Sequence, residues 1–351
     1  MLKVINAGMM TTIQDSGRWG YQGFGTPVAG AMDLKAYKVA NMLVGNKNEE
    51  AALELTMMGG EYEFTQDAFA AISGANMNAT LDGEPVNNWS SFKVAAGSRL
   101  QFTFATAGCR AYLAVAGGFD VPPVLGSRST HTRSKAGGLE GRALKVGDEL
   151  PIGSVDIAKS QPLTLSAELI PAMDTQVSLR VLLGPQDEDF TEKGIQTLFS
   201  NIYKVTSEAD RMGYRLEGEI IEHATKADIV SDALCQGAIQ VPAHGMPIIM
   251  MADRQTTGGY TKIGSVITAD LRLLAQVKPG DSVSFVQVDD DQAVQSLKED
   301  VEYYQAVEKY ISASGGAMVA AIAGAMLYKR NTKTYEISLR GKTYTAVVEE
   351  K

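Results

Sequence analysis

An internal repeat is the feature that most limits the folds open to this chain. Three pairs of segments match in the same order: GRWGYQ (17–22) with DRMGYR (210–215), GGEYEF (59–64) with QGAIQV (236–241), and FKVAAGSRLQF (92–102) with AQVKPGDSVSF (275–285). Self-similarity that keeps its order along the chain indicates a duplicated unit. We therefore expect two related domains joined in tandem, with the boundary near residues 155–178.

The repeated segments and their surroundings are typical of short strands separated by turns. EYEF (61–64), RLQFTF (99–104) and RAYLAVAG (110–117) combine aromatic, β-branched and small apolar residues. Glycine supplies 35 of the 351 residues without a collagen period, which suits a fold with many tight turns. We expect a mainly β fold of two barrel domains, residues 1–165 and 176–289.

Two parts of the chain depart from the strand pattern. Residues 30–46 carry apolar side chains at helical spacing, with Asp33 placed to cap the start and Gly45 to end the helix. The stretch DDDQAVQSLKEDVEYYQAVEKYI has an acidic start and predicts an amphipathic, solvated helix. TYEISLRGKTYTAVVEE then predicts a hairpin that turns at RGK. We expect residues 290–351 to form this helical and β-hairpin extension.

Composition and charge argue against several classes of protein. A net charge of −9 and a pI of about 5.0 give no electrostatic reason to bind nucleic acid or anionic lipid. The N-terminus lacks the apolar stretch of a signal peptide, and GGAMVAAIAGAML (315–327) is shorter than the ~20 residues of a membrane span. We expect a cytoplasmic protein with no nucleic-acid or membrane partner.

Nucleotide and metal motifs are missing from the sequence. It contains no P-loop, no HExxH, no EF-hand loop and no G-x-S-x-G elbow. The three histidines, His131, His223 and His244, are scattered, which argues against a metal site, and each alone is more often structural. Cys109 and Cys235 have no ligand spacing, and we expect free, buried thiols.

Four polar, glycine-rich segments carry side chains suited to a ligand. They are TTIQDSGRWGYQGFG (11–25), LGSRSTHTRSKAGGLEGR (125–142), ADRMGYRLEG (209–218), and MMADRQTTGGYTKIGSV (250–266) with its lead-in GAIQVPAHGMP. Arginine offers a planar fork for carboxylate or phosphate, and Gly-Gly lets backbone N–H groups approach an anion. Together the segments predict a pocket for a small, planar, hydrogen-bonding anion, shared across an interdomain cleft.

Each polar segment also has a structural interpretation as a well-capped turn. QDSGR and DRMGYR are consistent with paired Asp–Arg corners, and the loop 126–142 with a mobile, solvated loop. That interpretation is weakest for DRQTTGG, because Thr-Thr-Gly-Gly is a poor strand. The predicted catalytic residues are Asp253, Arg254, Gln255, Thr256 and Thr257, and the predicted substrate-binding residues are Gln14, Asp15, Arg18, Arg133, Arg211, Gln240 and Tyr260.

The polar segments resemble one protein family. TTIQDSGRWGYQGFGTPVAGAMD, ANMLVGN, GSRST…GGLEGRALKVGDEL, SDALCQGAIQVPAHGMPIIMMADRQTTGGYTKIGSVITADL and QVKPGDSVSF are similar to the biotin-dependent carboxyltransferase / allophanate-hydrolase-subunit-2 family, over residues 1–290. The resemblance implies two tandem cyclophilin-like β-barrel domains, which agrees with the internal repeat. It covers most of the chain, and its motifs are long and specific.

The resemblance also implies an activity and partners. A stand-alone chain of this size is most similar to the 5-oxoprolinase branch of the family, whose complexes convert 5-oxo-L-proline to L-glutamate with ATP as co-substrate. The partners implied are the B and A subunits of 5-oxoprolinase, of which the B protein is kinase-inhibitor-like, and we expect no activity from the chain alone. Two alternatives remain: a biotin-dependent carboxyltransferase acting on urea or a similar amide, and a regulatory protein that binds a kinase inhibitor.

These enzyme functions share a chemical demand and so imply roles for the polar residues. Both hold a lactam or amide whose carbonyl oxygen gains negative charge, where preorganised donors contribute most. The implied clamps for carboxylate or phosphate are Arg254, Arg211 or Arg133; Gln255, Thr256 and Thr257 would orient the amide; Asp253 or Asp15 would act as a base or would position an arginine.

Two departures from the family pattern affect these expectations. His131-Thr132 stands where an acidic and an apolar residue are expected, which changes the contacts of that loop. The segment TYEISLRGKTYTAVVEE is similar to the lead-in of biotinyl-carrier proteins, but no Met-Lys-Met site follows it. We therefore expect no biotin on this chain.

Overall fold

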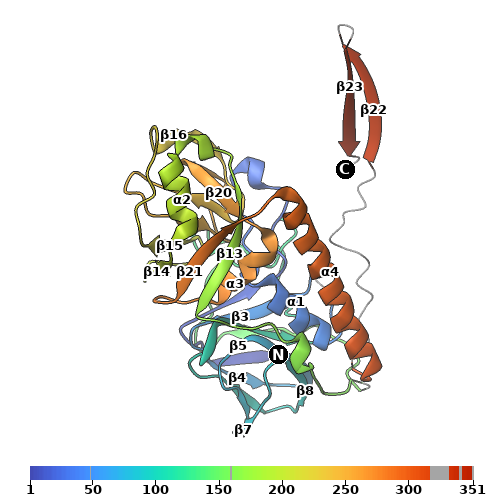
Figure 1. Cartoon of the computed structure of the whole chain (residues 1–351). Coiled ribbons are helices and arrows are strands. Elements are labelled where there is room, and N and C mark those ends of the chain that lie inside the picture. Colours follow the sequence, from blue (N-terminus) through green and yellow to red (C-terminus); the bar gives the residue numbers. More distant parts are fainter. Residues whose placement is uncertain (48, 159, 317–331, 340–341, 350–351) are drawn as a thin grey trace. The chain divides into compact units, whose positions relative to one another are not determined.

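The computed structural model describes residues 1–47, 49–158, 160–316, 332–339 and 342–349 (Figure 1). They form two compact units, Met1–Ala320 and Ala321–Lys351, which are described separately. The first unit is rich in strands and has few helices, so the expected mainly β fold is confirmed. Its strands form a sheet region, β1 to β12, and a barrel region, β13 to β21.

The sheet region consists of two six-stranded antiparallel sheets around one core. The first has the order β11-β1-β4-β9-β6-β7, built from β1 (Leu2–Asn6), β4 (Glu61–Phe64), β6 (Thr80–Leu81), β7 (Glu84–Pro85), β9 (Arg99–Gln101) and β11 (Glu149–Leu150). The second has the order β12-β8-β5-β10-β3-β2, built from β2 (Met10–Gln14), β3 (Ala52–Thr56), β5 (Ala68–Asn76), β8 (Ser90–Val94), β10 (Ala107–Val115) and β12 (Leu163–Thr164). Alternate side chains of both sheets point inward, as Leu53 and Leu55 do on β3.

The opposite face of the second sheet is polar and nevertheless buried. Because side chains alternate along a strand, Glu54 lies on the face opposite to Leu53 and Leu55. Antiparallel pairing sets Thr12 on β2 and Tyr112 on β10 opposite Glu54. Helix α1 (Leu34–Leu43) covers part of this face, and the barrel region covers another part. This polar face is therefore where the two regions meet.

The barrel region closes in the strand order β13-β20-β17-β18-β15-β14-β21. Its strands are β13 (Gln176–Leu183), β14 (Tyr203–Val205), β15 (Gly213–Glu217), β17 (Ala238–Gln240), β18 (Ile248–Met250), β20 (Lys262–Val266) and β21 (Ser282–Gln287). Strands β13 and β21 pair in parallel, and the other neighbours are antiparallel. A separate two-stranded ribbon joins β16 (Asp228–Ala233) to β19 (Thr257–Tyr260). Helices α2 (Glu192–Ser200) and α3 (Leu271–Gln276) belong to the same region.

Helix α1 is the helix expected in residues 30–46. The Asp33 carboxylate accepts the Ala36 N–H at 3.0 Å, and Gly45 adopts a left-handed φ of 76° after the last turn. Four short 3-10 helices complete the helical elements of the described residues: η1 (Gln22–Phe24), η2 (Ala167–Leu169), η3 (Asp187–Asp189) and η4 (Thr268–Asp270).

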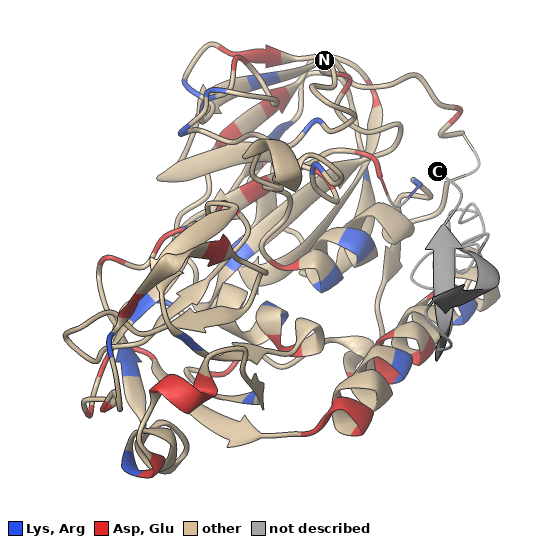
Figure 2. Ribbon diagram, turned by 90° about the horizontal axis from the view of Figure 1, so that it is seen from above, with Lys and Arg blue, Asp and Glu red and all other residues tan. Residues whose placement is uncertain are grey.

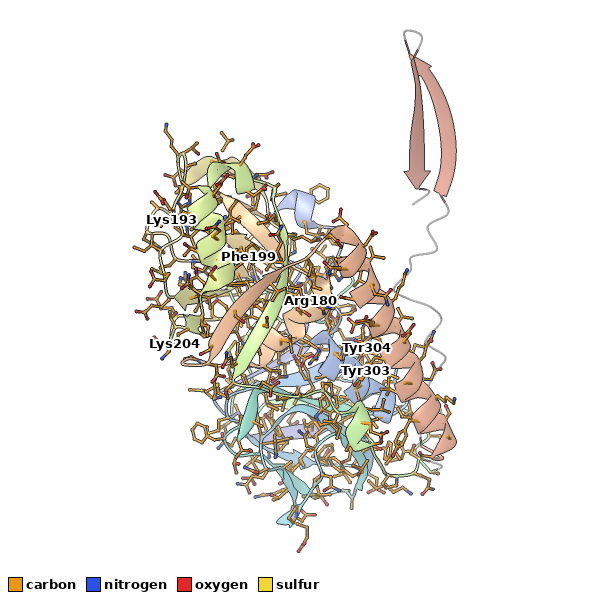
Figure 3. The ribbon with its side chains drawn as sticks, viewed as in Figure 1. Arg180, Lys193, Phe199, Lys204, Tyr303 and Tyr304 are labelled. Carbon is orange, nitrogen blue, oxygen red and sulfur yellow. The ribbon has the colours of Figure 1, made fainter. Side chains whose placement is uncertain are left out.

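Helix α4 (Asp290–Ala313) is the second expected helix. Asp289 and Gln292 form a capping box, followed by the acidic residues of the first turn (Figure 2). The helix is not a solvated appendage, because Tyr304, Val307 and Ile311 are buried. It packs on α1, with the Lys35 ammonium 4.4 Å from the centre of the Tyr303 ring. Figure 3 labels Tyr303 and Tyr304 on α4.

The internal repeat corresponds to shared structure at only part of its length. Gly97 and Gly280 both have left-handed φ. The Gly97 N–H donates to the carbonyl of Phe64, the last residue of β4, and the Gly280 N–H donates to the carbonyl of Val205, the last residue of β14. Phe64 and Val205 in turn donate to the residue after the glycine. The counterpart of β4 is thus β14, and the match of GGEYEF with QGAIQV was wrong.

The second unit is the expected terminal hairpin. Strands β22 (Thr332–Leu339) and β23 (Lys342–Glu349) pair antiparallel from Thr332↔Glu349 to Leu339↔Lys342. The predicted RGK turn includes residues 340–341, which lie outside the described residues, as does most of the apolar segment 315–327. Within the part of the chain that the structure describes, no helix has the length and apolar character needed to cross a membrane.

Candidate functional site

Arg211 joins the two regions of the first unit through its guanidinium. Nε and Nη2 donate to the two carboxylate oxygens of Asp253 at 3.0 and 2.8 Å, a bidentate pair. Nη1 donates to Oε1 of Glu54, and Nη2 also donates to the Gly30 carbonyl at 2.7 Å. Asp253 follows the barrel strand β18, whereas Glu54 and Gly30 belong to the sheet region.

Glu54 is the centre of this junction and was not predicted as a site residue. Its Oε2 accepts the Tyr112 hydroxyl at 2.7 Å and the Met32 N–H at 2.8 Å. Arg110 Nε lies 3.8 Å from Glu54 Oε1, and Arg110 Nη1 donates to the Tyr214 hydroxyl at 2.6 Å. The junction is thus a set of hydrogen bonds joined by the Glu54–Arg110 ion pair, and it crosses from β3 and β10 to β15.

The four charged groups of the junction are removed from water together. The exposed fractions of Glu54, Arg110, Arg211 and Asp253 are 1, 4, 5 and 6%. Burial acts to lower the pKa of Arg211, but the carboxylates of Asp253 and Glu54 outweigh it, and the pKa is raised. Because each charge has an opposite partner, the cluster is neutral overall and needs no ligand for compensation.

Asp15 and Arg18 hold the loop 124–129 and do not pair with each other. Asp15 accepts the Gly17 N–H at 2.8 Å, the hydroxyls of Ser127 and Ser129, and the Arg128 N–H. Arg18 donates to the carbonyls of Val124 and Ser129 at 2.8 and 2.9 Å. Burial lowers the pKa of Arg18, opposed by Asp15 and Asp253. These bonds make the segment a structural corner, in a different form from the paired Asp–Arg corner considered from sequence.

The loop 126–142 approaches the barrel region and contains an unpaired polar atom. Arg133 Nη1 contacts the Met212 sulfur, beside Arg211. His131 Nδ1 accepts the Ser134 N–H at 3.2 Å, and its Nε2 is buried without a hydrogen-bond partner among the described residues. The Oε1 of Gln14 is also buried and unpaired, although its Nε2 donates to the Thr130 carbonyl at 3.1 Å.

Arg254 differs from the buried Arg110 and Arg211, because within the described residues it has no carboxylate at ion-pair distance, a feature that it shares with Arg18. Its Nε donates to the Leu234 carbonyl at 3.1 Å and its Nη1 to the Met251 carbonyl at 3.3 Å. Burial lowers the pKa of Arg254, with Cys235 acting in the opposite direction. A buried cation that is held only by carbonyls is well suited to an anionic ligand, which would offset its desolvation.

The remaining predicted residues lie on or near the ribbon: Gln255 and Thr256 precede strand β19, Thr257 and Tyr260 lie on it, and Gln240 lies on the barrel strand β17. Gln255 and Thr257 are exposed, and the carbonyl of the half-buried Thr256 accepts the Leu234 N–H at 2.9 Å. Tyr260 is 40% exposed, and Gln240 is buried and donates to the Tyr260 carbonyl at 3.4 Å. These residues therefore adjoin Arg254 through the backbone of Leu234 or lie at the ribbon. They are not part of the junction around Glu54.

The predicted segments come together at the junction across the two regions. The Ala29 N–H donates to the Ala252 carbonyl at 3.1 Å, which sets the chain that follows Arg18 against the turn that carries Asp253 and Arg254. Four further residues here are buried and hydrogen-bonded but were not predicted as site residues: Glu54, Arg110, Lys262 and Gln276. The available signal was a lone charge in an apolar strand, such as Glu54 within AALELT.

The described residues bear on the expectations for metal binding and for the two cysteines. No group of three or more His, Cys, Asp or Glu side chains is placed there to hold a metal ion. Both cysteines are free, as expected, but only Cys109 is buried. Cys235 is exposed because it follows the exposed ribbon strand β16, so the expectation of two buried thiols was wrong for Cys235.

Comparison with known proteins places the chain in a family. The model of the carboxyltransferase domain, subdomains A and B, matches residues 24–287. The C subunit of the Escherichia coli K12 5-oxoprolinase is 40% identical over 87% of this chain and 97% of its own length, and that of Haemophilus influenzae is 36% identical over 89 and 99%. The urea amidolyase of Lachancea kluyveri is 34% identical over 85% of this chain but only 17% of its own length.

Solved structures agree with this family. The urea amidolyase of K. lactis superposes with a TM-score of 0.83 and 29% identity, over 92% of this chain and 20% of that one. The Kluyveromyces lactis urea carboxylase gives a TM-score of 0.83 and 27% identity, over 99 and 32% of the two chains. The fold and the sequence motifs therefore lead to one conclusion: this chain belongs to the carboxyltransferase domain family, the biotin-dependent carboxyltransferase and allophanate-hydrolase-subunit-2 family.

Proposed function

We propose that the chain is the C subunit of an ATP-dependent 5-oxoprolinase, which works with the A and B subunits to convert 5-oxo-L-proline to L-glutamate. The observation that carries the proposal is the 40% identity to a protein of that name over nearly the whole of both chains. ATP is a co-substrate of the complex, and the missing P-loop supports its binding to one of the partner proteins. The chain is inactive alone.

Arg254 is the group that supports an anionic substrate best. Its charge is buried and unpaired within the described residues, and 5-oxo-L-proline carries a carboxylate that a guanidinium fork can bind. Gln255 and Thr257 are exposed beside it, and in this proposal they orient the lactam amide. Asp253 and Asp15 have their oxygens occupied by protein donors, which favours a positioning role over that of a base.

The test is a reconstituted complex of this chain with the A and B subunits, in which ADP and glutamate formation are measured against 5-oxo-L-proline. Turnover requires all three proteins. Arg254→Lys keeps the charge but loses the planar fork, and lowers kcat/KM by about 100-fold. Arg215→Lys, on an exposed arginine of β15, is the matched control and leaves turnover unchanged.

The outcomes separate the function from the site. A wild-type complex without 5-oxo-L-proline-dependent ADP formation would exclude the function. Turnover by that complex with Arg254→Lys at the wild-type rate would exclude Arg254 as a substrate clamp while leaving the function in place.

Carboxyl transfer to urea or a similar amide is a second candidate. The family model and the likeness to urea carboxylase and urea amidolyase favour it, although those proteins are several times longer than this chain. It requires a separate biotin carrier. Urea-dependent loss of carboxyl from a carboxybiotinylated carrier in the presence of this chain would support it, and no loss would remove it.

A further inference from the structure

A chain of buried charges leads from the sheet region to the candidate substrate clamp. Glu54 on β3 binds Arg211, Arg211 binds Asp253, and Asp253 immediately precedes Arg254. We propose that Glu54 is a positioning residue, which acts through Arg211 and Asp253 to hold the Arg254 guanidinium where it meets the substrate. The kinetic part of this inference rests on the proposed function, and the geometric part does not.

The guanidinium of Arg211 can adopt few other orientations in this arrangement. Its Nε and Nη2 donate along one edge of the guanidinium to the two Asp253 oxygens. Nη2 also donates to the Gly30 carbonyl, and Nη1 donates to Glu54. The Asp253 backbone N–H adds a bond to the Arg211 carbonyl at 2.8 Å. Asp253 is thus fixed to Arg211 at both its side chain and its backbone, and Glu54 fixes Arg211 in turn.

The turn that carries Arg254 depends on the position of Asp253. The Arg254 N–H closes the turn on the Met251 carbonyl at 3.2 Å, and the same carbonyl accepts Arg254 Nη1 at 3.3 Å. A displacement of Asp253 therefore moves both the backbone of Arg254 and one of the two acceptors that hold its guanidinium. Glu54 does not need to touch Arg254 to affect it.

A purely adhesive role explains the buried charges less well. Replacing a buried ion pair by well-packed apolar residues is often neutral or stabilising, so charge is a poor choice for adhesion alone. Each region already has its own apolar core. What the charges add is direction, because a bidentate Arg–carboxylate pair forms in one relative orientation. This supports a role in setting the geometry of the turn.

The kinetic test is a double-mutant cycle in the reconstituted complex. Glu54→Gln keeps the shape of the side chain, removes its charge and lowers kcat/KM by at least about tenfold, since small misplacements of a clamp are costly. In a chain that already carries Arg254→Lys, Glu54→Gln produces no further loss of kcat/KM, because the guanidinium fork that Glu54 positions is already gone. If Glu54 and Arg254 contributed independently, the fold losses in kcat/KM of the two variants would multiply. That result would overturn the proposal.

A second readout is independent of turnover. The NMR resonance of the Arg254 Nε–H group in the full-length chain is identified by its absence in Arg254→Lys. We expect this resonance to shift in Glu54→Gln. The control is Glu61→Gln, which breaks an ion pair with Arg99 in the other sheet, and it leaves the resonance in place. Should the Arg254 signal be the same in Glu54→Gln and wild type, the proposal fails even if the enzyme complex proves to have another substrate.

If Glu54→Gln folds poorly, a second variant, Tyr112→Phe, still tests whether Glu54 positions Arg254. Tyr112→Phe removes the hydroxyl that donates to Glu54 Oε2 and accepts the Asp33 N–H, and it is a milder change at the same carboxylate because the charge of Glu54 is kept. It shifts the same Arg254 resonance, by less. An unshifted resonance in a folded Tyr112→Phe chain would count against positioning through Glu54.

Discussion

Arg18 and Arg211 lie in the similar sequence segments GRWGYQ and DRMGYR, yet their surroundings are opposite. Arg18 is bound by the carbonyls of Val124 and Ser129, and its pKa is lowered, chiefly by burial. Arg211 is bound by the carboxylates of Asp253 and Glu54, which raise its pKa against the effect of burial. Both guanidinium groups are buried, so exposure does not explain the difference.

The difference shows that the partners of an arginine, more than its motif, determine its role. Arg18 fastens a loop within the sheet region, where neutral acceptors are enough. Arg211 joins strands of different regions, where charge fixes both distance and direction. Arg254 resembles Arg18 in having only carbonyl acceptors, but it stands beside the charged junction. That combination is what makes Arg254 the candidate clamp.

Removing the cation from the charged junction gives the largest expected loss of stability. Arg211→Met leaves the buried Glu54 and Asp253 without their shared partner, and costs about 3–5 kcal/mol in the free energy of unfolding. Urea denaturation of the full-length chain measures it. Arg215→Met, an exposed neighbour, is the control and changes the value by less than about 0.5 kcal/mol. An Arg211→Met chain as stable as the control would end the distinction between the two arginines.

Arg18→Met has a smaller expected effect, because it leaves carbonyls and no carboxylate without a cation. Losing donors to buried carbonyls costs about 1–3 kcal/mol. The same denaturation experiment measures this loss. We predict that Arg211→Met loses more of the free energy of unfolding than Arg18→Met does. The reverse ranking would mean that loop anchoring matters more to stability than the charged junction does.

Much of the fold could be predicted from the sequence, because it depends on local patterns. Alternating strands, the Asp33 cap and the glycine of the 278–281 turn act over a few residues, and each has a recognisable signature. The match of GGEYEF with QGAIQV failed because both are alternating strands, and alternation says nothing of which neighbour a strand pairs with.

The candidate site could be predicted only in part. Arg211, Asp253 and Arg254 were identified from residue type and turn context. Their pairing with Glu54 was not, since Glu54 lies 157 positions from Arg211 in the chain and its strand is otherwise uncharged. Partners across such separations follow from how the sheet region and the barrel region pack, and a single sequence holds no local record of that packing.

A third buried cation, Lys38, extends the comparison to a group that faces an aromatic ring. Its ammonium lies 5.0 Å from the centre of the Tyr304 ring on α4, and burial lowers its pKa to about 8, opposed by Asp300. In the unfolded chain a lysine titrates near pH ~10.4. Between these values the unfolded chain binds a proton that the folded chain lacks, so this lysine makes the free energy of unfolding rise with pH.

Lys38→Met should therefore have a small effect that depends on pH. Near pH 7 the folded chain bears the cost of burying the charge, so the variant is the more stable protein, provided that the methionine fills the same space. The advantage shrinks as pH rises above about 8, because wild-type Lys38 then folds in its neutral form. Urea denaturation of both proteins across this range measures the difference. A constant difference would show that Lys38 keeps its proton when folded, held by the Tyr304 ring and Asp300 as firmly as Arg211 is held by its carboxylates.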